Sequence, residues 1–264
     1  MPKSVPHRYP FDSALVTGAS SGIGEAFVRR LAAAGVPVVV VARREDRLQA
    51  LAAQMTGIEV LVADLATTGG LQAVTERIKD PDRPIDLVVN NAGFGTSGKF
   101  SELDPERLVR EVNVNVQAVT WLTHAATRAM SKRDRGWILN VSSVAGFQPS
   151  PGLAVYAATK AYVTNLTEGV HEEMRGSGVH VTALCPGLVR TEFQSVSNAT
   201  GQTSKFPSWA WLDVDDLVAE ALDDVIAGKA LSIPGVVYKG LSTATNMAPR
   251  WLARRASSMA QRMR

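Results

Sequence analysis

Ser13-Ala14-Leu15-Val16-Thr17-Gly18-Ala19-Ser20-Ser21-Gly22-Ile23-Gly24 is the stretch of sequence that decides the fold. An apolar run enters a turn rich in glycine and serine, and a helical pattern follows over residues 23–34. Glycines permit a tight turn and a close backbone approach to a ligand. The start of a helix offers free N–H groups and a positive dipole end to a phosphate. The stretch therefore predicts a strand, a phosphate-binding turn and a helix. A turn without a ligand is the alternative, because the spacing G-x-x-x-G-x-G differs from the dinucleotide fingerprint.

Outward from this turn, short apolar runs alternate with longer helical patterns. The runs expected to form strands are residues 13–17, 36–42, 59–62, 85–90, 137–142, 179–185 and 230–233. The helical patterns cover residues 23–34, 45–55, 71–78, 105–130, 155–175 and 214–227. Within the second and fourth runs, residues 38–41 and 87–89 are continuously apolar, which is typical of strands covered on both faces. We expect a single α/β domain with a doubly wound parallel sheet of about seven strands, flanked by helices. Ligands of such sheets bind at the carboxyl ends of the strands.

Composition limits the remaining classes. The chain has 264 residues, 45% of them hydrophobic, and we expect one domain over residues 12–235 between an arm at 1–11 and a basic tail at 236–264. The single cysteine, Cys185, lies in an apolar run and is expected to be a buried structural thiol. No Cys/His cluster indicates a metal site. The amino-terminal segment resembles neither a signal peptide nor a membrane anchor, so we expect a cytoplasmic protein.

The carboxyl-terminal tail carries the excess positive charge. Six basic residues and no acidic one lie between Lys239 and Arg264, although the net charge of the chain is only +3. We expect a solvated helix face or an oligomer contact, with an anionic membrane surface as the minor alternative and no binding of nucleic acid. Leu252, Ala256, Met259 and Met263 recur at helical spacing, so the tail is amphipathic.

The end of the second run indicates the type of nucleotide. Many NAD sites have an acidic residue here to bind the ribose hydroxyls, whereas this chain has Arg43 and Arg44 after Ala42. A guanidinium suits a 2′-phosphate, so we expect NADP(H) rather than NAD(H), with Arg43 the stronger candidate. The arginines could instead simply open a charged helix. Asp64, after the third run, could bind an adenine amine or cap the next turn.

The pair Tyr156 and Lys160 indicates the chemistry. The two residues are four positions apart in a helical pattern, and therefore share one face. A nearby cation favours the phenolate, so we expect Lys160 to lower the pKa of Tyr156 and the pair to act as a general acid/base. Ser143, at the end of the fifth run, could donate to a substrate oxygen.

Taken together, these motifs resemble the short-chain dehydrogenase/reductase family over about residues 12 to 235. The resemblance implies that Tyr156 exchanges a proton with the substrate oxygen, that Lys160 also holds the nicotinamide ribose, and that Ser143 binds the reacting oxygen. It also implies that Asn115, rather than Asn113, supports a water linked to the lysine. The implied cofactor contacts are Gly18, Ser20, Ser21, Gly22, Ile23, Gly24, Arg43, Arg44, Asp64, Leu65, Asn91, Ala92, Gly93, Tyr156, Lys160, Pro186, Gly187, Val189 and Thr191.

Residues 192–212, here called the lid segment, are polar but carry four aromatic residues, so we expect them to cover the substrate site or to pack locally on the surface. The expected activity is NADP(H)-dependent oxidoreduction of a carbonyl or secondary alcohol. A hydrophobic ketone or 3-oxoacyl compound is the expected substrate. A non-catalytic NADP-binding sensor or scaffold on the same fold is the alternative function. The expected assembly is a homodimer or homotetramer, although the chain lacks the Gly-Gly ending common in the family.

Overall fold

The computed structural model describes residues 8–198 and 207–240. The strands are β1 (Ala14–Thr17), β2 (Val38–Ala42), β3 (Ile58–Val62), β4 (Leu87–Asn90), β5 (Gly136–Val141), β6 (Val179–Leu184), β7 (Leu188–Val189), β8 (Trp211–Leu212) and β9 (Leu231–Ser232). The helices are α1 (Gly22–Ala33), α2 (Glu45–Gln54), α3 (Thr68–Lys79), α4 (Pro105–Val112), α5 (Val119–Ser131), α6 (Ala154–Glu173), α7 (Phe193–Val196) and α9 (Val214–Ile226).

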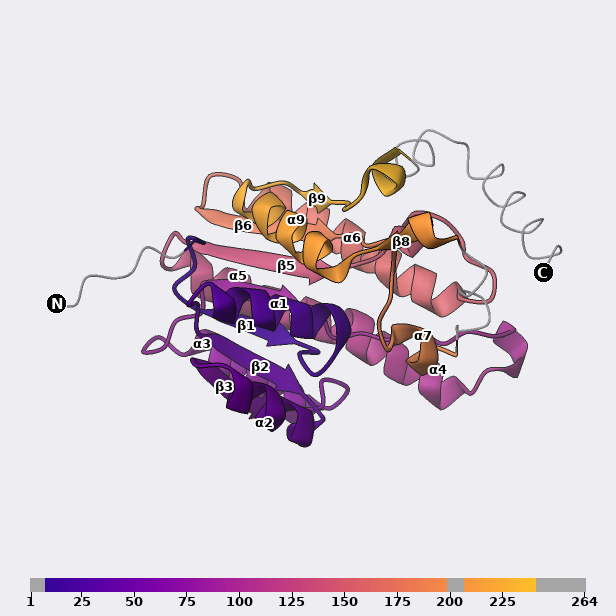
Figure 1. Ribbon diagram of the computed structural model, residues 1–264, viewed down its shortest axis with the longest axis horizontal. Coiled ribbons are helices and arrows are strands. Elements are labelled where there is room, and N and C mark those ends of the chain that lie inside the picture. Colours follow the sequence, from indigo (N-terminus) through magenta and orange to yellow (C-terminus); the bar gives the residue numbers. More distant parts are fainter. Residues whose placement is uncertain (1–7, 199–206, 241–264) are drawn as a thin grey trace.

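Seven strands form one parallel sheet in the order β3-β2-β1-β4-β5-β6-β9. The order runs outward in both directions from β1, so the chain winds first one way and then the other. The winding reverses between β1 and β4, which are neighbours in the sheet. The loops that follow these two strands therefore leave their carboxyl ends on opposite sides of a crevice. Figure 1 shows these strands ending on the same side of the molecule as α4, α7 and β8. The predicted doubly wound α/β fold and its seven strands are confirmed.

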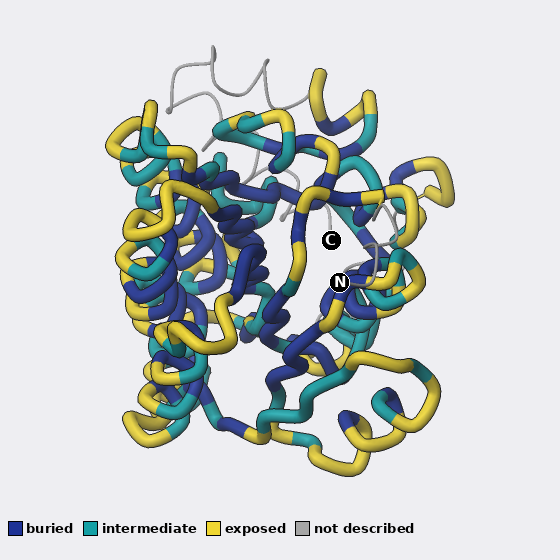
Figure 2. Tube along the Cα trace, turned by 90° about the vertical axis from the view of Figure 1, so that its left-hand side faces the viewer, coloured by how far each residue is buried: buried dark blue, intermediate teal, exposed yellow. Residues whose placement is uncertain are grey.

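The alternating side chains of the strands supply two cores, one on each face of the sheet. Val38 and Val40 point to the face covered by α1, α2 and α9, whereas Val39 and Val41 point to the face covered by α3 and α5. Figure 2 shows the buried strands between helices whose outer surfaces are exposed. Burial on both faces explains why the strands lack the polar alternation of a half-exposed sheet.

Side-chain caps fix where several helices begin. The Thr67 hydroxyl accepts a hydrogen bond from the Gly70 backbone N–H at the start of α3. Asp104 does the same for Glu106 at the start of α4, where Pro105 occupies the first helical position. These caps satisfy N–H groups that the helix itself leaves free. They also set the point at which the chain leaves each loop on the site side of the sheet.

The structure differs from the sequence prediction in three places. The pattern over residues 105–130 is not one helix, because a π-helical segment at Asn113–Ala118 separates α4 from α5. The short pair β7–β8 was not predicted, and it joins the chain after β6 to the end of the lid segment. Tyr9 and Phe11, expected in an arm outside the domain, are buried, and Phe11 packs edge-on against Trp137 at 5.0 Å between ring centroids.

Across the described ranges 8–198 and 207–240, none of the helices is both long enough and apolar enough to cross a bilayer. The basic tail from residue 241 onward, with its amphipathic pattern, lies outside the described residues.

Candidate functional site

The turn between β1 and α1 has the geometry of a close-approach site. Gly18 and Gly22 have φ angles of 65° and 58°, a region that favours glycine. A Cβ on Gly24 would lie 2.3 Å from the Gly18 carbonyl oxygen and 2.5 Å from Asn91 Nδ2. These three glycines therefore let the turn fold tightly under α1 and against the end of β4. A side chain at any of them would push the turn out of place.

The end of β4 is hydrogen-bonded to the same turn. The backbone N–H groups of Asn91 and Ala92 both donate to the Thr17 hydroxyl at 3.0 Å, and Asn91 Nδ2 donates to the Thr17 carbonyl at 2.9 Å. Asn90 instead turns into the sheet, where its amide donates to Asn140 at 2.8 Å. Asn91 and Ala92 thus join the end of β4 to the Gly-rich turn, while Asn90 links β4 to β5 inside the sheet.

Arg44 lies against the Gly-rich turn. Its Nη2 atom donates to the hydroxyls of Ser20 and Ser21, each at 2.9 Å, and its Nη1 atom donates to Glu192 at 2.9 Å. Arg43 is exposed, and the sequence favoured it as the phosphate ligand. The geometry supports Arg44 in that role more than Arg43. Ser21 is the N-cap residue of α1, and its side chain makes no capping hydrogen bond. Its hydroxyl instead accepts the hydrogen bond from Arg44.

Asp64 follows β3 and behaves as a turn cap in this structure. One carboxylate oxygen accepts a hydrogen bond from the Ala66 backbone N–H at 3.0 Å, and the other pairs with Arg110 at the exposed edge of α4. The following residue, Leu65, is buried in the core beside α3. Of the two roles that the sequence left open for Asp64, the structure displays the capping role. Adenine binding by Asp64 or Leu65 stays a prediction.

The asparagine that the sequence favoured, Asn115, is fully buried in the π-helical segment. Its amide makes two hydrogen bonds with the Phe94 backbone, at 3.1 Å to the N–H and 2.8 Å to the carbonyl, and donates to Thr159 at 3.0 Å. A Cβ on Gly93 would lie 3.0 Å from Asn115 Oδ1 and 3.4 Å from Lys160 Nζ. Asn115 and Lys160 therefore meet beneath Gly93, where the loop after β4 passes closest to α6.

Tyr156 and Lys160 are both buried on the face of α6 that packs toward β5. Lys160 Nζ donates to the Val141 carbonyl at 2.7 Å and lies 5.7 Å from the centroid of the Tyr156 ring. Burial lowers the pKa of the Lys160 ammonium to about 8. The spacing thus brings the phenol and the amine together, as predicted.

The pKa of Tyr156 was predicted to be lowered, and this direction was wrong. Burial raises the pKa of Tyr156 to about 12, and a hydrogen bond with Ser143 acts more weakly in the opposite direction. The cation does not offset burial because Lys160 is directed at the end of β5 rather than at the phenolic oxygen. Desolvation of the phenolate is therefore the dominant effect here, and Tyr156 is held as a neutral phenol.

The two serines after β5 have separate roles. The Ser142 hydroxyl donates to the Lys160 carbonyl at 2.7 Å, inside the packing of α6 on the sheet. Ser143 is partly exposed, accepts a hydrogen bond from the Ala145 backbone N–H at 3.1 Å, and hydrogen-bonds Tyr156. Ser143 is thus the serine beside the phenol, and Ser142 is structural.

The segment from Pro186 to Thr191 runs along the crevice. The Pro186 carbonyl lies 3.5 Å from the Ser143 hydroxyl. Gly187 lies beneath the ring of Tyr238, which would be 2.1 Å from a Cβ added at Gly187. Val189 is buried in β7, and Thr191 lies over the Gly-rich turn, 3.1 Å from where Gly22 would carry a Cβ. This segment therefore connects the surroundings of Ser143 to the Gly-rich turn.

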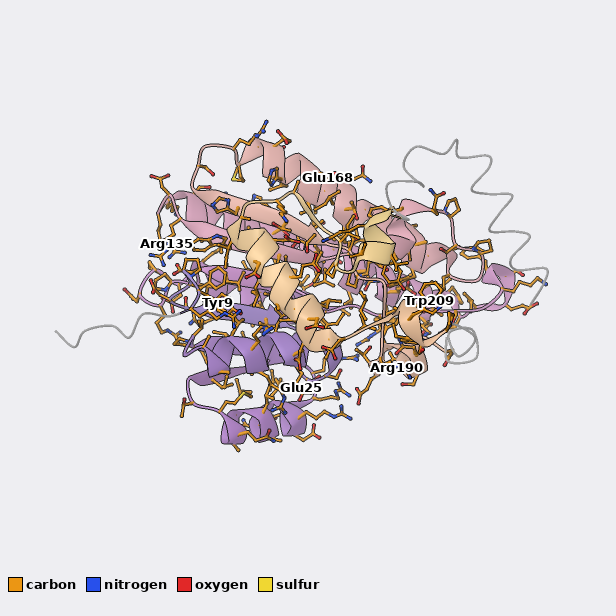
Figure 3. The ribbon with its side chains drawn as sticks, turned by 45° about the horizontal axis from the view of Figure 1, so that its top comes forward. Tyr9, Glu25, Arg135, Glu168, Arg190 and Trp209 are labelled. Carbon is orange, nitrogen blue, oxygen red and sulfur yellow. The ribbon has the colours of Figure 1, made fainter. Side chains whose placement is uncertain are left out.

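The described part of the lid segment packs on Tyr156. The ring of Phe193 in α7 packs on Tyr156, with 5.2 Å between the ring centroids. Ser197 holds the lid to the loop after β4, because its hydroxyl accepts from the Gly95 N–H at 3.2 Å. Figure 3 places Arg190 and the exposed Trp209 at this end of the molecule, away from Tyr9 and Arg135. Phe206 lies outside the described residues.

Glu111 is a buried acid that the sequence analysis missed. Its side chain is fully buried, and its carboxylate has Thr96 as a hydrogen-bonding neighbour. Burial raises the pKa of this carboxyl, whereas Thr96, Arg107 and Lys160 lower it less strongly. Glu111 lies one turn before Asn115, on a helix that also carries Glu106, Arg107 and Arg110. Because the sequence of α4 is largely polar, no local pattern indicates that Glu111 is buried.

Other chemistries receive no support from the described residues. Cys185 is fully buried, and burial raises the pKa of its thiol to about 11, so the predicted structural thiol is confirmed. No group of three or more His, Cys, Asp or Glu side chains within residues 8–198 and 207–240 could hold a metal ion.

Known proteins resemble this chain in sequence and in fold. The family described as short chain dehydrogenase matches residues 12–202. An uncharacterized oxidoreductase of Myxococcus xanthus is 36% identical over 225 residues, which cover 83% of this chain and 86% of that protein.

Two solved structures extend the comparison. A short-chain dehydrogenase from Sphingobium yanoikuyae in complex with NADPH has a TM-score of 0.79 and 35% identity, covering 89% of this chain and 93% of its own. The bulky-bulky ketone specific alcohol dehydrogenase from Comamonas testosteroni has a TM-score of 0.76 and 33% identity, covering 89% and 92%. The chain spans most of the length of each of these proteins. It therefore belongs to the short-chain dehydrogenase/reductase family of oxidoreductases.

Proposed function

We propose that the protein is an NADP(H)-dependent oxidoreductase that interconverts a carbonyl and a secondary alcohol, with Tyr156 as the general acid/base. The observation that carries this proposal is the meeting of four side chains at the carboxyl ends of the strands. Tyr156 and Lys160 share the buried face of α6, Ser143 hydrogen-bonds the phenol, and Asn115 lies beside Lys160 under Gly93. A non-catalytic sensor on this fold would have no need of the whole set.

The residues of the crevice fit a nicotinamide dinucleotide. Gly18, Gly22 and Gly24 keep side chains away from the start of α1, so a pyrophosphate can reach the free N–H groups there. Arg44 supplies a guanidinium beside Ser20 and Ser21 for a 2′-phosphate. When bound, NADPH supplies the hydride and thus the two electrons of the reduction. The site residues inferred from the sequence are proposed as the contacts of this cofactor.

The protein's own contribution is to place and supply one proton. In the direction of reduction, the Tyr156 hydroxyl donates a hydrogen bond and then its proton to the substrate oxygen. The Ser143 hydroxyl donates to the same oxygen as negative charge develops there, a contribution typically worth about 3 kcal/mol. The high pKa of Tyr156 in this structure, about 12, means that the phenol arrives protonated. Lys160, whose Nζ lies 5.7 Å from the centroid of the phenol ring, is proposed to bind the hydroxyls of the nicotinamide ribose.

A hydrophobic ketone or 3-oxoacyl compound is the proposed substrate. Phe193 presents an aromatic ring beside Tyr156, where the substituents of a carbonyl compound would lie. The Comamonas testosteroni relative, by its name, acts on ketones with two bulky substituents. We expect the same crevice in this chain to favour apolar carbonyl compounds over small polar ones.

The test is consumption of NADPH with panels of bulky ketones, acyl thioesters and steroids, followed by absorbance. We expect turnover with at least one apolar carbonyl compound and a preference for NADPH over NADH. Replacement of Arg44 by Ala should weaken NADPH binding much more than NADH binding, and Arg43→Ala should have the smaller effect. Equal losses for both cofactors would contradict the phosphate role. Tight NADPH binding without turnover of any carbonyl compound would favour the sensor.

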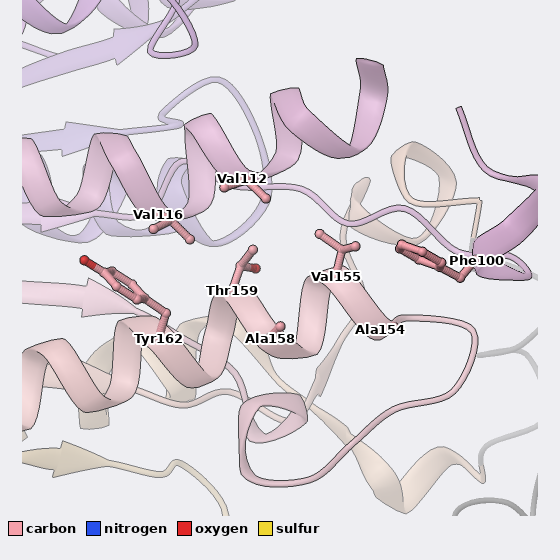
Figure 4. A pocket seen from close by; sticks show the side chains of 8 residues that line it. All are labelled: Phe100, Val112, Val116, Ala154, Val155, Ala158, Thr159 and Tyr162. Atoms are coloured by element: carbon pink, nitrogen blue, oxygen red, sulfur yellow. The ribbon is translucent and has the colours of Figure 1, made fainter. Parts of the chain in front are cut away.

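Assembly as a homodimer or homotetramer is also proposed, and an exposed apolar surface supports it. A groove of about 430 Å³ between the π-helical segment and α6 is lined by Val116, Val155 and Tyr162, among others (Figure 4). It lies on a different face of α6 from Tyr156, and Trp121 and Val109 are exposed nearby on the same helical run. Surfaces of this kind are usually covered by a partner. Replacement of Trp121 by Glu should lower the sedimentation coefficient, and an unchanged value would exclude this face as the contact.

A further inference from the structure

Glu192, the first residue of the lid segment, already occupies an anion position in the arginine cluster formed by Arg44 and Arg47. One carboxylate oxygen accepts from Arg44 Nη1 at 2.9 Å, and the other accepts from Arg47 Nη1 at 2.6 Å. Glu192 lies 148 positions from Arg44 in the sequence. Its pKa is lowered to about 2 by hydrogen bonds from Arg47 and Arg44, so the carboxylate stays ionised at any working pH.

Arg44 joins this carboxylate to the phosphate end of the crevice. The same guanidinium that binds Glu192 through Nη1 donates through Nη2 and Nε to the Ser20 hydroxyl, at 2.9 and 3.1 Å. A 2′-phosphate bound at the proposed cofactor site would need donors from this guanidinium. Glu192 and the phosphate are both anions with forked oxygens, so they compete for the same hydrogen-bond donors.

We infer that Glu192 is a cofactor-specificity residue. Its carboxylate is an internal anion that a 2′-phosphate must displace from Arg44. A cofactor without this phosphate leaves the carboxylate in place. This inference rests on the NADP(H) dependence proposed above. It gives Glu192 a role in addition to those of the Gly-rich turn and the arginines. A nucleotide with a ribose 2′-hydroxyl gains nothing from displacing the carboxylate. Only the phosphorylated nucleotide therefore experiences the competition.

The exposure of the three side chains makes the exchange feasible. The side chains of Arg44 and Glu192 are 39% and 41% exposed, and that of Arg47 is 44% exposed. Ion pairs exposed to this degree are weak, because water screens them and long side chains lose freedom in making them. A phosphate monoester carries about −1.5 to −2 charge at neutral pH and offers three acceptor oxygens. It should therefore replace one carboxylate, although the carboxylate still reduces the apparent affinity.

The position of Glu192 connects this exchange to the catalytic end. The next residue, Phe193, packs on Tyr156. The Glu192 carbonyl accepts from the Val196 N–H at 3.0 Å and from the Ser195 hydroxyl at 2.8 Å, so it is tied to α7. Release of the Glu192 side chain from the arginines would remove one of the contacts that hold this short helix over the crevice. Binding of the 2′-phosphate at one end thus loosens the cover of the tyrosine at the other.

The test uses two adenine nucleotides that differ only in the 2′-phosphate, adenosine 2′,5′-bisphosphate and adenosine 5′-monophosphate. Their dissociation constants are measured by isothermal titration calorimetry on the full-length wild-type protein and on Glu192→Gln. We expect the substitution to tighten bisphosphate binding by about 3- to 10-fold, in proportion to the loss of a weak exposed pair. Monophosphate binding should be unchanged. The gain should shrink as salt is added, since screening weakens the original competition.

Glu45→Gln is the matched control, because Glu45 is an exposed carboxylate in the first turn of the same helix as Arg47. A general change in local charge would affect both variants equally, and this result would overturn the inference. An unchanged or weaker affinity of Glu192→Gln for the bisphosphate would overturn it as well. Failure of the wild-type protein to bind either nucleotide would instead remove the proposed cofactor site, and the inference with it. The wild-type protein could bind the two nucleotides equally while Glu192→Gln alone binds the bisphosphate more tightly. That result would support the competition between Glu192 and the phosphate but contradict the NADP(H) preference.

Discussion

The Nζ atom of Lys160 lies 2.7 Å from the carbonyl oxygen of Val141, the last residue of β5. This hydrogen bond directs the ammonium toward the crevice between the strand ends. The amine is buried, and burial lowers its pKa from 10.5 in water to about 8. Lys160 thus carries a desolvation penalty at neutral pH, which links its protonation to the stability of the fold.

The sign of that linkage gives the first prediction. Between pH 8 and 10.5 the folded protein loses the Lys160 proton while the unfolded chain retains it, so this group makes stability rise with pH in that window. In Lys160→Met the rise should be missing, a difference on the order of 3 kcal/mol across the window. Urea unfolding at a series of pH values measures it. The exposed Lys79→Met is the control, and parallel curves for wild type and Lys160→Met would contradict the prediction.

Glu111 leads to the second prediction, with the opposite sign. Burial raises the pKa of its carboxyl above 4.5, so as pH rises from that value the unfolded chain releases the proton first and stability falls. Glu111→Gln removes this penalty, so its stability relative to wild type should increase as the pH is raised from 4 to 7. Denaturant titrations at both pH values test this. The exposed Glu76→Gln should show no such difference, and equal behaviour of the two variants would count against the assignment.

Tyr156 carries the third prediction. Phenylalanine at this position keeps the ring contact with Phe193 but has no proton to donate. Turnover should fall by about 100- to 10,000-fold, while NADPH binding measured by fluorescence stays nearly unchanged. Tyr162, six residues later on α6, is partly exposed and hydrogen-bonds Thr120 at 2.9 Å, so Tyr162→Phe is the matched control. Near-normal turnover of Tyr156→Phe would remove Tyr156 from the mechanism.

Gly24 carries the fourth prediction. A methyl group there would lie 2.3 Å from the Gly18 carbonyl oxygen, closer than atoms can approach. Gly24→Ala should therefore displace the turn, lower the unfolding free energy by about 1–3 kcal/mol, and weaken nucleotide binding. Gly69 in α3 has nothing within 4 Å of its would-be Cβ, so Gly69→Ala should be neutral or stabilise by about 0.5 kcal/mol. Thermal unfolding and calorimetry distinguish the two, and similar effects would show that close packing at Gly24 is unimportant.

The sequence predicted the sheet well because burial on both faces leaves a strong local signal. Val38–Ala42 is apolar throughout, and the predicted strand differs from it only by two residues at the start. The pairing of Tyr156 with Lys160 was also local, since one helical turn separates the residues. Both features depend on short stretches of chain, in which neighbours in sequence are neighbours in space.

Features that depend on distant partners were not predictable. Glu192 gives no local sign that it meets Arg44, and Glu111 resembles the exposed acids around it. The π-helical segment at Asn113–Ala118 preserves the apolar periodicity of a helix, so its boundary leaves no mark in the pattern. The direction of the Tyr156 pKa shift was wrong for the same reason, because the balance of burial against charge depends on where the amine of Lys160 points.

The single thiol of this chain has a practical consequence for spectroscopy. Cys185 is fully buried, and its pKa of about 11 leaves almost no thiolate at neutral pH. A cysteine introduced at the exposed Ser195, on α7, would therefore take a maleimide fluorophore alone, with no need to remove the native residue. The emission of such a label would report changes in the surroundings of α7, whose Phe193 packs on Tyr156.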